Sequence, residues 1–184
     1  MKTLTVRVRE DHLETIAKTK PMTAIAELIW NALDAEATEV KVVFDQNELD
    51  GLEGIHIIDN GTGLHYDDGV MVFESRTHAL RRELHGKYGK GRFRAFTLGS
   101  HASWNTVYEE AGDRYAFSIS GTASTLGQFS ITNAKGAQGA ETGMTVSILN
   151  PPLNCGVLLG VKAMQEITDI FALYLRQYPG VRLI

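Results

Sequence analysis

Hydrophobic and polar positions alternate in several short segments, which is typical of half-buried strands. Residues 3–9 show this pattern, with Leu4, Val6 and Val8 on one face. Similar patterns, separated by turns rich in glycine, aspartate and asparagine, fall at residues 39–44, 54–58, 104–109, 114–119, 127–132 and 143–149. We expect the last four of these strands to form an antiparallel meander.

Apolar residues recur at steps of three and four from Pro21 to about Glu36 and predict an amphipathic helix that begins at the proline. A D-x-x-E start at Asp11 predicts a short helix before it. Residues 64–98 should be mostly helical, and a long amphipathic helix is expected after the proline pair at 151–152.

Helix patterns and strand patterns are partly segregated along the chain. This favours an α+β fold, with a layer of helices on one face of a mixed, mostly antiparallel sheet, over a doubly wound array. The last residues, YPGVRLI, read as a new strand. We therefore predict one domain over residues 1–178 and the start of a following domain at 179–184.

Composition supports a single globular domain, because 43% of the 184 residues are hydrophobic and 22% are charged. The net charge of −4 does not indicate a generic nucleic-acid or membrane binder. The single cysteine, Cys155, cannot form an internal disulfide. With no apolar run long enough for a signal peptide or a membrane span, we expect a cytoplasmic protein without membrane contact.

The predicted helix at 21–36 carries the first candidate site residues. Glu27, Asn31 and Asp34 are spaced by four and three residues, so they share one face of the helix beside its apolar stripe. A carboxylate and an amide oxygen one turn apart can hold an attacking water and one corner of a Mg²⁺ ion. The alternative is an ordinary solvated helix face.

A second candidate follows the strand at 54–58, where Asp59 precedes a turn that contains Gly61 and Gly63. The carboxylate of Asp59 could accept a hydrogen bond from an exocyclic amine, while the glycines let the backbone approach a planar base. An Asn-Gly hairpin turn is the alternative interpretation.

A third candidate is the G-x-x-G-x-G segment from Gly86 to Gly91, whose backbone N–H groups could cradle a phosphate ahead of a short helix. It is neither a Walker A loop nor a dinucleotide fingerprint. Basic residues gather here, since seven of the 18 lysines and arginines fall between positions 76 and 94: Arg76, Arg81, Arg82, Lys87, Lys90, Arg92 and Arg94. A solvated basic loop is the alternative.

These motifs, followed by Gly143-x-Thr145 at the last strand, occur in an order that resembles the GHKL ATPase superfamily of gyrase B subunits, ninety-kilodalton heat-shock chaperones, histidine kinases and MutL. The resemblance covers about residues 1–150 and implies a two-layer α/β sandwich of the Bergerat type. It implies that Glu27 is the general base, that Asn31 binds Mg²⁺, and that Asp59 binds the adenine amine of ATP or ADP. The residues implied in nucleotide binding, including a mobile ATP lid at about 65–95, are Asp34, Asp59, Gly61, Gly63, Gly86, Lys87, Tyr88, Gly89, Lys90, Gly91, Arg92, Phe93 and Thr145.

Within the superfamily, residues 31–38 look like MutL, the heat-shock chaperones and the MORC ATPases, and Glu27 disfavours a histidine kinase. Residues 89–98 are more similar to the chaperone and MORC lids than to the L-G-F-R-G-E-A form of MutL, which favours the former branch. In these relatives a second domain follows and contributes a lysine to the γ-phosphate.

The resemblance implies Mg²⁺-dependent ATP binding and slow hydrolysis, with lid closure and nucleotide-dependent homodimerisation acting as a conformational switch. DNA is a possible partner of the full-length protein. Two other functions remain open at this point: a phosphotransfer domain like that of histidine kinases, and a nucleic-acid-binding module with a vestigial nucleotide site.

Overall fold

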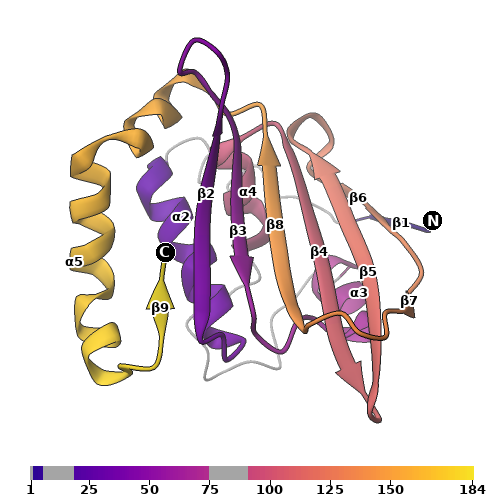
Figure 1. Cartoon of the computed structure of the whole chain (residues 1–184). Coiled ribbons are helices and arrows are strands. Elements are labelled where there is room, and N and C mark those ends of the chain that lie inside the picture. Colours follow the sequence, from indigo (N-terminus) through magenta and orange to yellow (C-terminus); the bar gives the residue numbers. More distant parts are fainter. Residues whose placement is uncertain (1, 6–18, 75–90) are drawn as a thin grey trace.

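A computed structural model describes residues 2–5, 19–74 and 91–184 of the chain (Figure 1). Its strands are β1 (Lys2–Thr5), β2 (Glu39–Gln46), β3 (Leu52–Asp59), β4 (His101–Glu110), β5 (Asp113–Thr122), β6 (Gln128–Ile131), β7 (Lys135–Gly136), β8 (Gly143–Leu149) and β9 (Arg182–Leu183). Its α-helices are α2 (Pro21–Asp34), α3 (Tyr66–Glu74), α4 (Gly91–Leu98) and α5 (Val161–Gln177). Short 3₁₀ turns are η1 (Ala123–Thr125) and η2 (Leu153–Leu159).

The strands form one mixed sheet in the order β1-β6-β5-β4-β8-β3-β2-β9, with β7 paired to β5. Only the pair β2–β9 is parallel among the described strand pairs. Figure 1 shows the helices on one side of this sheet, while its other face is open. The expected α+β fold of two layers is confirmed.

Helix α2 lies at the centre of the helix layer, with α4 and α5 as neighbours, and packs on β2 and β3 of the sheet. It begins at Pro21, which suits the first helical position because proline has no N–H to leave unpaired there. Its apolar stripe, including Ile25 and Ile29, is buried in the core. The helix ends at Asp34, and Glu36 follows with a left-handed φ of 64° that turns the chain toward β2.

The expected four-stranded meander is wrong in one strand. β4, β5 and β6 do pair in sequence, but β8 lies between β4 and β3. β8 buries Val146 and Ile148 against the helix layer, and β1 pairs with the remaining edge of β6. In the middle of the sheet, β8 therefore has a hydrogen-bonded strand on each side, β3 and β4. At the edge of a meander, next to β6, it would have had a strand on one side only.

The strand expected at the end of the chain is present as β9, and its partner is β2. Ile184 donates its N–H to the carbonyl of Val40 at 2.9 Å, and Val42 donates to the carbonyl of Ile184 at 2.8 Å. Arg182 also forms an ion pair with Glu39. These residues complete one edge of the sheet, and the following domain stays a prediction.

Two expected elements lie outside the described residues: the short helix at Asp11 and the glycine segment from Gly86 to Lys90. Of the helices that the structure describes, none combines the length and apolar character needed to cross a membrane.

Candidate functional site

Asp59 ends β3, with its side chain on the same face of the strand as the buried Ile55 and Ile57, toward the helices. Its Oδ1 atom accepts hydrogen bonds from the N–H groups of Gly61 at 2.9 Å and Met144 at 3.2 Å. No described residue donates to Oδ2, so this oxygen has capacity for another donor. Burial raises the pKa of the Asp59 carboxyl group, and the two hydrogen bonds oppose this shift only in part.

The turn after Asp59 is fixed to the end of α2. Asn60 Oδ1 accepts hydrogen bonds from the backbone N–H groups of Thr38 at 2.9 Å and Glu39 at 2.8 Å. Thr62 donates its N–H to the carbonyl of Ala35 at 2.8 Å. These bonds hold the aspartate and the C-terminal turn of α2 in one rigid unit.

Three glycines permit the close approaches at this turn. A Cβ atom at Gly61 would lie 2.5 Å from the carbonyl oxygen of Ala35. At Gly63, where φ is +73°, it would lie 2.1 Å from the carbonyl oxygen of Val107. At Gly143 it would lie 2.1 Å from the carbonyl oxygen of Asp59. The start of β8 can therefore lie this close to β3 only because residue 143 has no side chain.

Thr106 of β4 supports the same region, although no sequence motif singled it out. Its side chain is 3% exposed, and its Oγ1 accepts the N–H of Leu64 at 2.8 Å and donates to the carbonyl of Gly143 at 3.3 Å. It thus joins the glycine turn to the start of β8. A threonine within a strand pattern is too common for sequence reasoning to have found it.

Glu27, the expected general base, lies on α2 and faces α4. Its Oε2 is 2.9 Å from Nε of Arg94, and the two side chains are 35% and 18% exposed. Arg94 also donates from Nη1 to Oγ1 of Thr19, just before α2. Arg94 was counted in the basic cluster but not among the candidate site residues, so the structure adds it to the site.

The other two candidates on α2 lie nearer its C-terminal end. Asn31 is exposed, one turn after Glu27. Asp34 comes one turn after Trp30, whose ring packs against Tyr174 of α5. The pKa of the Tyr174 hydroxyl is raised by burial first, then by the charges of Tyr178 and Asp34. Asp34 therefore lies near α5.

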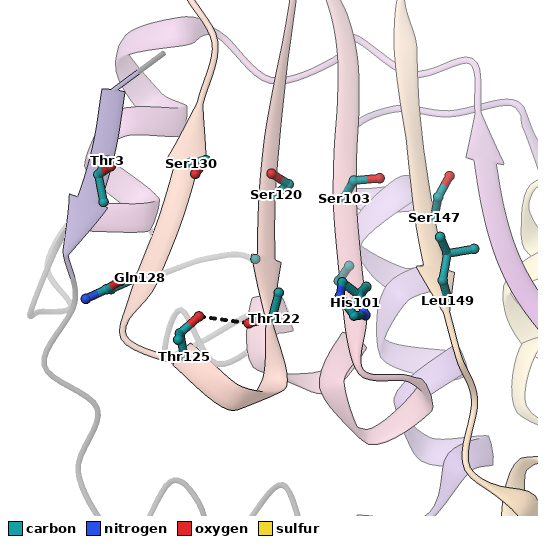
Figure 2. A pocket seen from close by; sticks show the side chains of 12 residues that line it. Thr3, His101, Ser103, Ser120, Thr122, Thr125, Gln128, Ser130, Ser147 and Leu149 are labelled. Carbon is teal, nitrogen blue, oxygen red and sulfur yellow. Dashed lines mark hydrogen bonds between the residues drawn. The ribbon is translucent and has the colours of Figure 1, made fainter.

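Thr145 faces away from the helices, which corrects its expected place beside the base. Figure 2 shows Ser147 and Leu149 of β8 on the open face of the sheet, and Thr145 shares their face because side chains alternate along a strand. Met144, one residue earlier, is the β8 residue that donates its N–H to Asp59. On β8, the contact with Asp59 is therefore made by a backbone group and not by the side chain of Thr145.

The open face carries its own features, apart from the candidate site. A row of hydroxyl groups crosses five strands there and lines a shallow cavity of about 330 Å³ (Figure 2): Thr3, Ser130, Ser120, Ser103 and Ser147. A second hollow of about 610 Å³ on this face is lined by Thr145 and Asn105, among others, with Asp59 also at its wall. Because Asp59 Oδ1 is bonded to the turn on the helix side, we assign its carboxylate to the helix face.

Of the glycine segment, the structure describes only its end, where Gly91 begins α4 and Arg92 follows. The side chain of Phe93 is 4% exposed, and its ring centroid is 6.1 Å from that of Phe129. Phe93 is therefore a core residue, and its expected role in nucleotide binding stays a prediction. Its backbone belongs to the first turn of α4.

A family model described as "Histidine kinase-, DNA gyrase B-, and HSP90-like ATPase" matches residues 19–137. The match spans α2, the Asp59 turn and α4, together with the strands from β2 to β7. The chain belongs to this ATPase family. The resemblance to the GHKL superfamily drawn from the motifs is thereby confirmed, as is the α/β fold it implies.

Curated relatives of this ATPase domain are mismatch-repair proteins. The DNA mismatch repair protein MutL of Staphylococcus saprophyticus is 43% identical over 54 residues, which are 29% of this chain and 8% of that protein. MutL of Geobacillus sp. (strain WCH70) is 32% identical over 80 residues, 44% of this chain and 12% of that protein. The chain thus aligns with only about a tenth of the length of these relatives.

The similarity to MutL gives no support to the preference for the chaperone and MORC branch, which rested on residues 89–98. That preference stays a prediction. Of the residues on which it rests, Gly89 and Lys90 lie outside the described residues.

Proposed function

We propose that this domain binds ATP with Mg²⁺ and hydrolyses it slowly, and that the nucleotide drives lid closure and dimerisation of the full-length protein. The observation that carries the proposal is the Asp59 carboxylate, which two backbone N–H groups fix through one oxygen while no described residue donates to the other. Family membership supports the ATPase activity in general.

In this proposal Asp59 Oδ2 accepts a hydrogen bond from the amino group of adenine. The backbone around Gly61 and Gly63 is held close to its neighbours by the contacts that exclude a Cβ atom, so the base meets a preformed wall. An acceptor at this place selects a 6-amino purine over a 6-oxo purine, which would oppose a carbonyl oxygen to the carboxylate.

The phosphates would extend from Asp59 along α2 toward its N-terminal half. Glu27 precedes Ala35 by eight residues, which places it about 12 Å from the Asp59 turn along the helix axis. Asn31 lies between these ends with an exposed amide, whose oxygen is a hard ligand suited to Mg²⁺. When bound, the metal supplies charge stabilisation to phosphate oxygens, and the remaining ligands are phosphate and water oxygens.

In this proposal Glu27 activates water at the γ-phosphate end. Its carboxylate would accept a proton from water as the water oxygen forms a bond to the γ-phosphorus. The bond from that phosphorus to the bridging oxygen breaks, and its electron pair leaves with ADP. The N-terminal end of α4 carries the positive end of the helix dipole, which can stabilise the phosphate oxygens during this transfer.

The relatives named as mismatch-repair proteins support DNA as a partner of the full-length protein. Chaperone-like or MORC-like use of the same ATPase cycle is the finer assignment that the sequence of residues 89–98 favours. DNA binding and the chaperone-like or MORC-like assignment both concern the whole protein, and both are part of this proposal.

The Asp59→Asn variant tests nucleotide binding. Replacing Oδ2 by an amide that cannot accept a hydrogen bond should lower ADP affinity by about tenfold or more, since an opposed donor pair in a buried site costs about 1–3 kcal/mol. Calorimetry with Mg²⁺ and ADP measures this. Asp50→Asn, at an exposed loop position, is the matched control and should bind like the parent. Equal affinity of Asp59→Asn and the parent would remove Asp59 from the base pocket.

The Glu27→Gln variant tests hydrolysis. Loss of the general base should lower turnover by about 10² to 10⁴ while ATP binding persists. Phosphate release under saturating ATP measures the rate in the full-length protein, and Glu166→Gln on the exposed face of α5 serves as the control. Unchanged turnover would show that Glu27 takes no part in the reaction.

A further inference from the structure

Arg94 places a guanidinium group directly beside the expected general base. It lies in the first turn of α4, three residues after Gly91, and its Nε is 2.9 Å from Oε2 of Glu27. The Nε atom is buried, yet its N–H is not aligned for a hydrogen bond with any described acceptor. The contact is therefore an ion pair with poor hydrogen-bond geometry, which leaves the guanidinium able to reorient toward a better acceptor.

The position of the Glu27–Arg94 ion pair relative to the proposed nucleotide site matters more than the strength of the ion pair. Glu27 lies in the middle of α2, about two turns from the Asp59 turn, where a triphosphate bound by that turn would place its last phosphate. A carboxylate there repels the γ-phosphate, and a neighbouring arginine offsets that repulsion. Guanidinium groups bind carboxylate and phosphate oxygens with similar planar geometry, so both groups compete for Arg94.

Of the side chains that the structure describes on α4, Arg94 alone is cationic and shown in contact with Glu27. Its contact with Thr19 fixes the guanidinium at the N-terminal end of α2. The side chain is therefore held between two elements that a bound γ-phosphate would have to approach: the first turn of α4 and the middle of α2.

We propose that Arg94 recognises the γ-phosphate of bound ATP, so that the guanidinium held by Glu27 in the nucleotide-free domain turns to the phosphate and releases the carboxylate to accept a proton from water. This inference rests on the proposed ATPase function. It gives the domain a cation within its own fold that distinguishes ATP from ADP, in addition to any cation from another domain.

The test compares affinities for ADP and for a non-hydrolysable ATP analogue, both with Mg²⁺, by calorimetry. Arg94→Ala should lower analogue affinity by about tenfold while ADP affinity changes less than about threefold, because only the analogue carries the third phosphate. Arg94→Lys should keep part of the preference, since the charge remains but the planar geometry is lost. Arg176→Ala, at an exposed position on α5, is the matched control.

Glu27→Gln supplies the second arm of the test. Removing the competing carboxylate should raise affinity for the ATP analogue several-fold when Arg94 is present. The same change should raise that affinity much less in the Arg94→Ala background. Equal losses for ADP and the analogue, or no loss for either, in a folded Arg94→Lys or Arg94→Ala variant would overturn the inference and leave Arg94 a structural residue. Failure of the parent itself to bind either nucleotide would instead overturn the proposed function, and this inference with it.

Discussion

At the scale of single residues, Asp59 shows how a buried carboxylate can cost stability. Burial raises the pKa of its carboxyl above the ordinary value of 3.8, so the native state retains this proton to higher pH than the unfolded chain does. The charged form at neutral pH therefore destabilises the fold, and this cost vanishes as the pH falls below the ordinary value. The proposed contact with adenine would give this charge a role that offsets its cost.

The first prediction follows from this cost. Asp59→Asn keeps an oxygen that can accept from Gly61 and Met144 but removes the buried charge, so its melting temperature without nucleotide should exceed that of the parent at pH 7. The difference should shrink as the pH is lowered toward about 4. Thermal unfolding across this pH series measures it, and a variant less stable than the parent at pH 7 would show that the charge is not a cost.

Sequence reasoning identified the chemistry of the site but not the direction of each side chain. Asp59 was singled out because an acid before a glycine turn is distinctive. Thr145 was chosen on β8, whereas the β8 residue that contacts the Asp59 carboxylate is Met144, through its backbone N–H. A shift of one residue along a strand moves a side chain to the opposite face, and a motif alone does not fix that register. Arg94 was missed because its partner, Glu27, is distant in sequence.

At the scale of elements, the glycine turn after β3 depends on backbone conformation and on space. Gly63 has φ of +73° and would place a Cβ atom 2.1 Å from the carbonyl oxygen of Val107. Gly112, in the hairpin between β4 and β5, has a similar φ of +88° but nothing within 4 Å. A comparison of Gly63 with Gly112 therefore separates the cost of a positive φ from the cost of a steric clash.

The second prediction uses this pair. Gly112→Ala should lower the free energy of unfolding by about 1–2 kcal/mol, the usual cost of a left-handed alanine. Gly63→Ala should cost more, by about 1–3 kcal/mol beyond that, because β4 must also move. Urea unfolding monitored by fluorescence of Trp30 and Trp104 measures both variants. Equal losses would mean that the turn relaxes freely and is not a rigid wall of the site.

The elements themselves were largely predictable, while one part of their order was not. α2 and the strands carry local signals, namely apolar periodicity, a starting proline and glycine turns, and these set their positions within a few residues. The insertion of β8 between β3 and β4 depends on pairing between residues distant in sequence, such as Ile57 with Val146. Nothing local to β8 specifies those partners, so the meander expected from adjacency failed.

At the scale of the whole molecule, the two faces of the sheet have separate characters. The helix face holds Asp59, Glu27 and Arg94, joined through α2, the glycine turn and α4. The open face holds the row of hydroxyl groups that Figure 2 shows, with no candidate site residue on the cavity they line. Nucleotide should therefore act on elements of the helix face that are far apart in sequence and leave part of the sheet unaffected.

The third prediction is a pattern of hydrogen exchange. Adding Mg²⁺ and a non-hydrolysable ATP analogue should slow exchange in α2, in the turn at 60–63 and in the first turn of α4, because one ligand contacts all three. Peptides that cover β6 should exchange at the same rate with and without analogue, since β6 lies toward the β1 edge of the sheet and three strands separate it from β3. Mass spectrometry of the parent measures this, and Asp59→Asn, which should bind weakly, is the control for specific binding. Protection confined to β6 and the strands around the 330 Å³ cavity would place the nucleotide on the open face and contradict the assignment of the site.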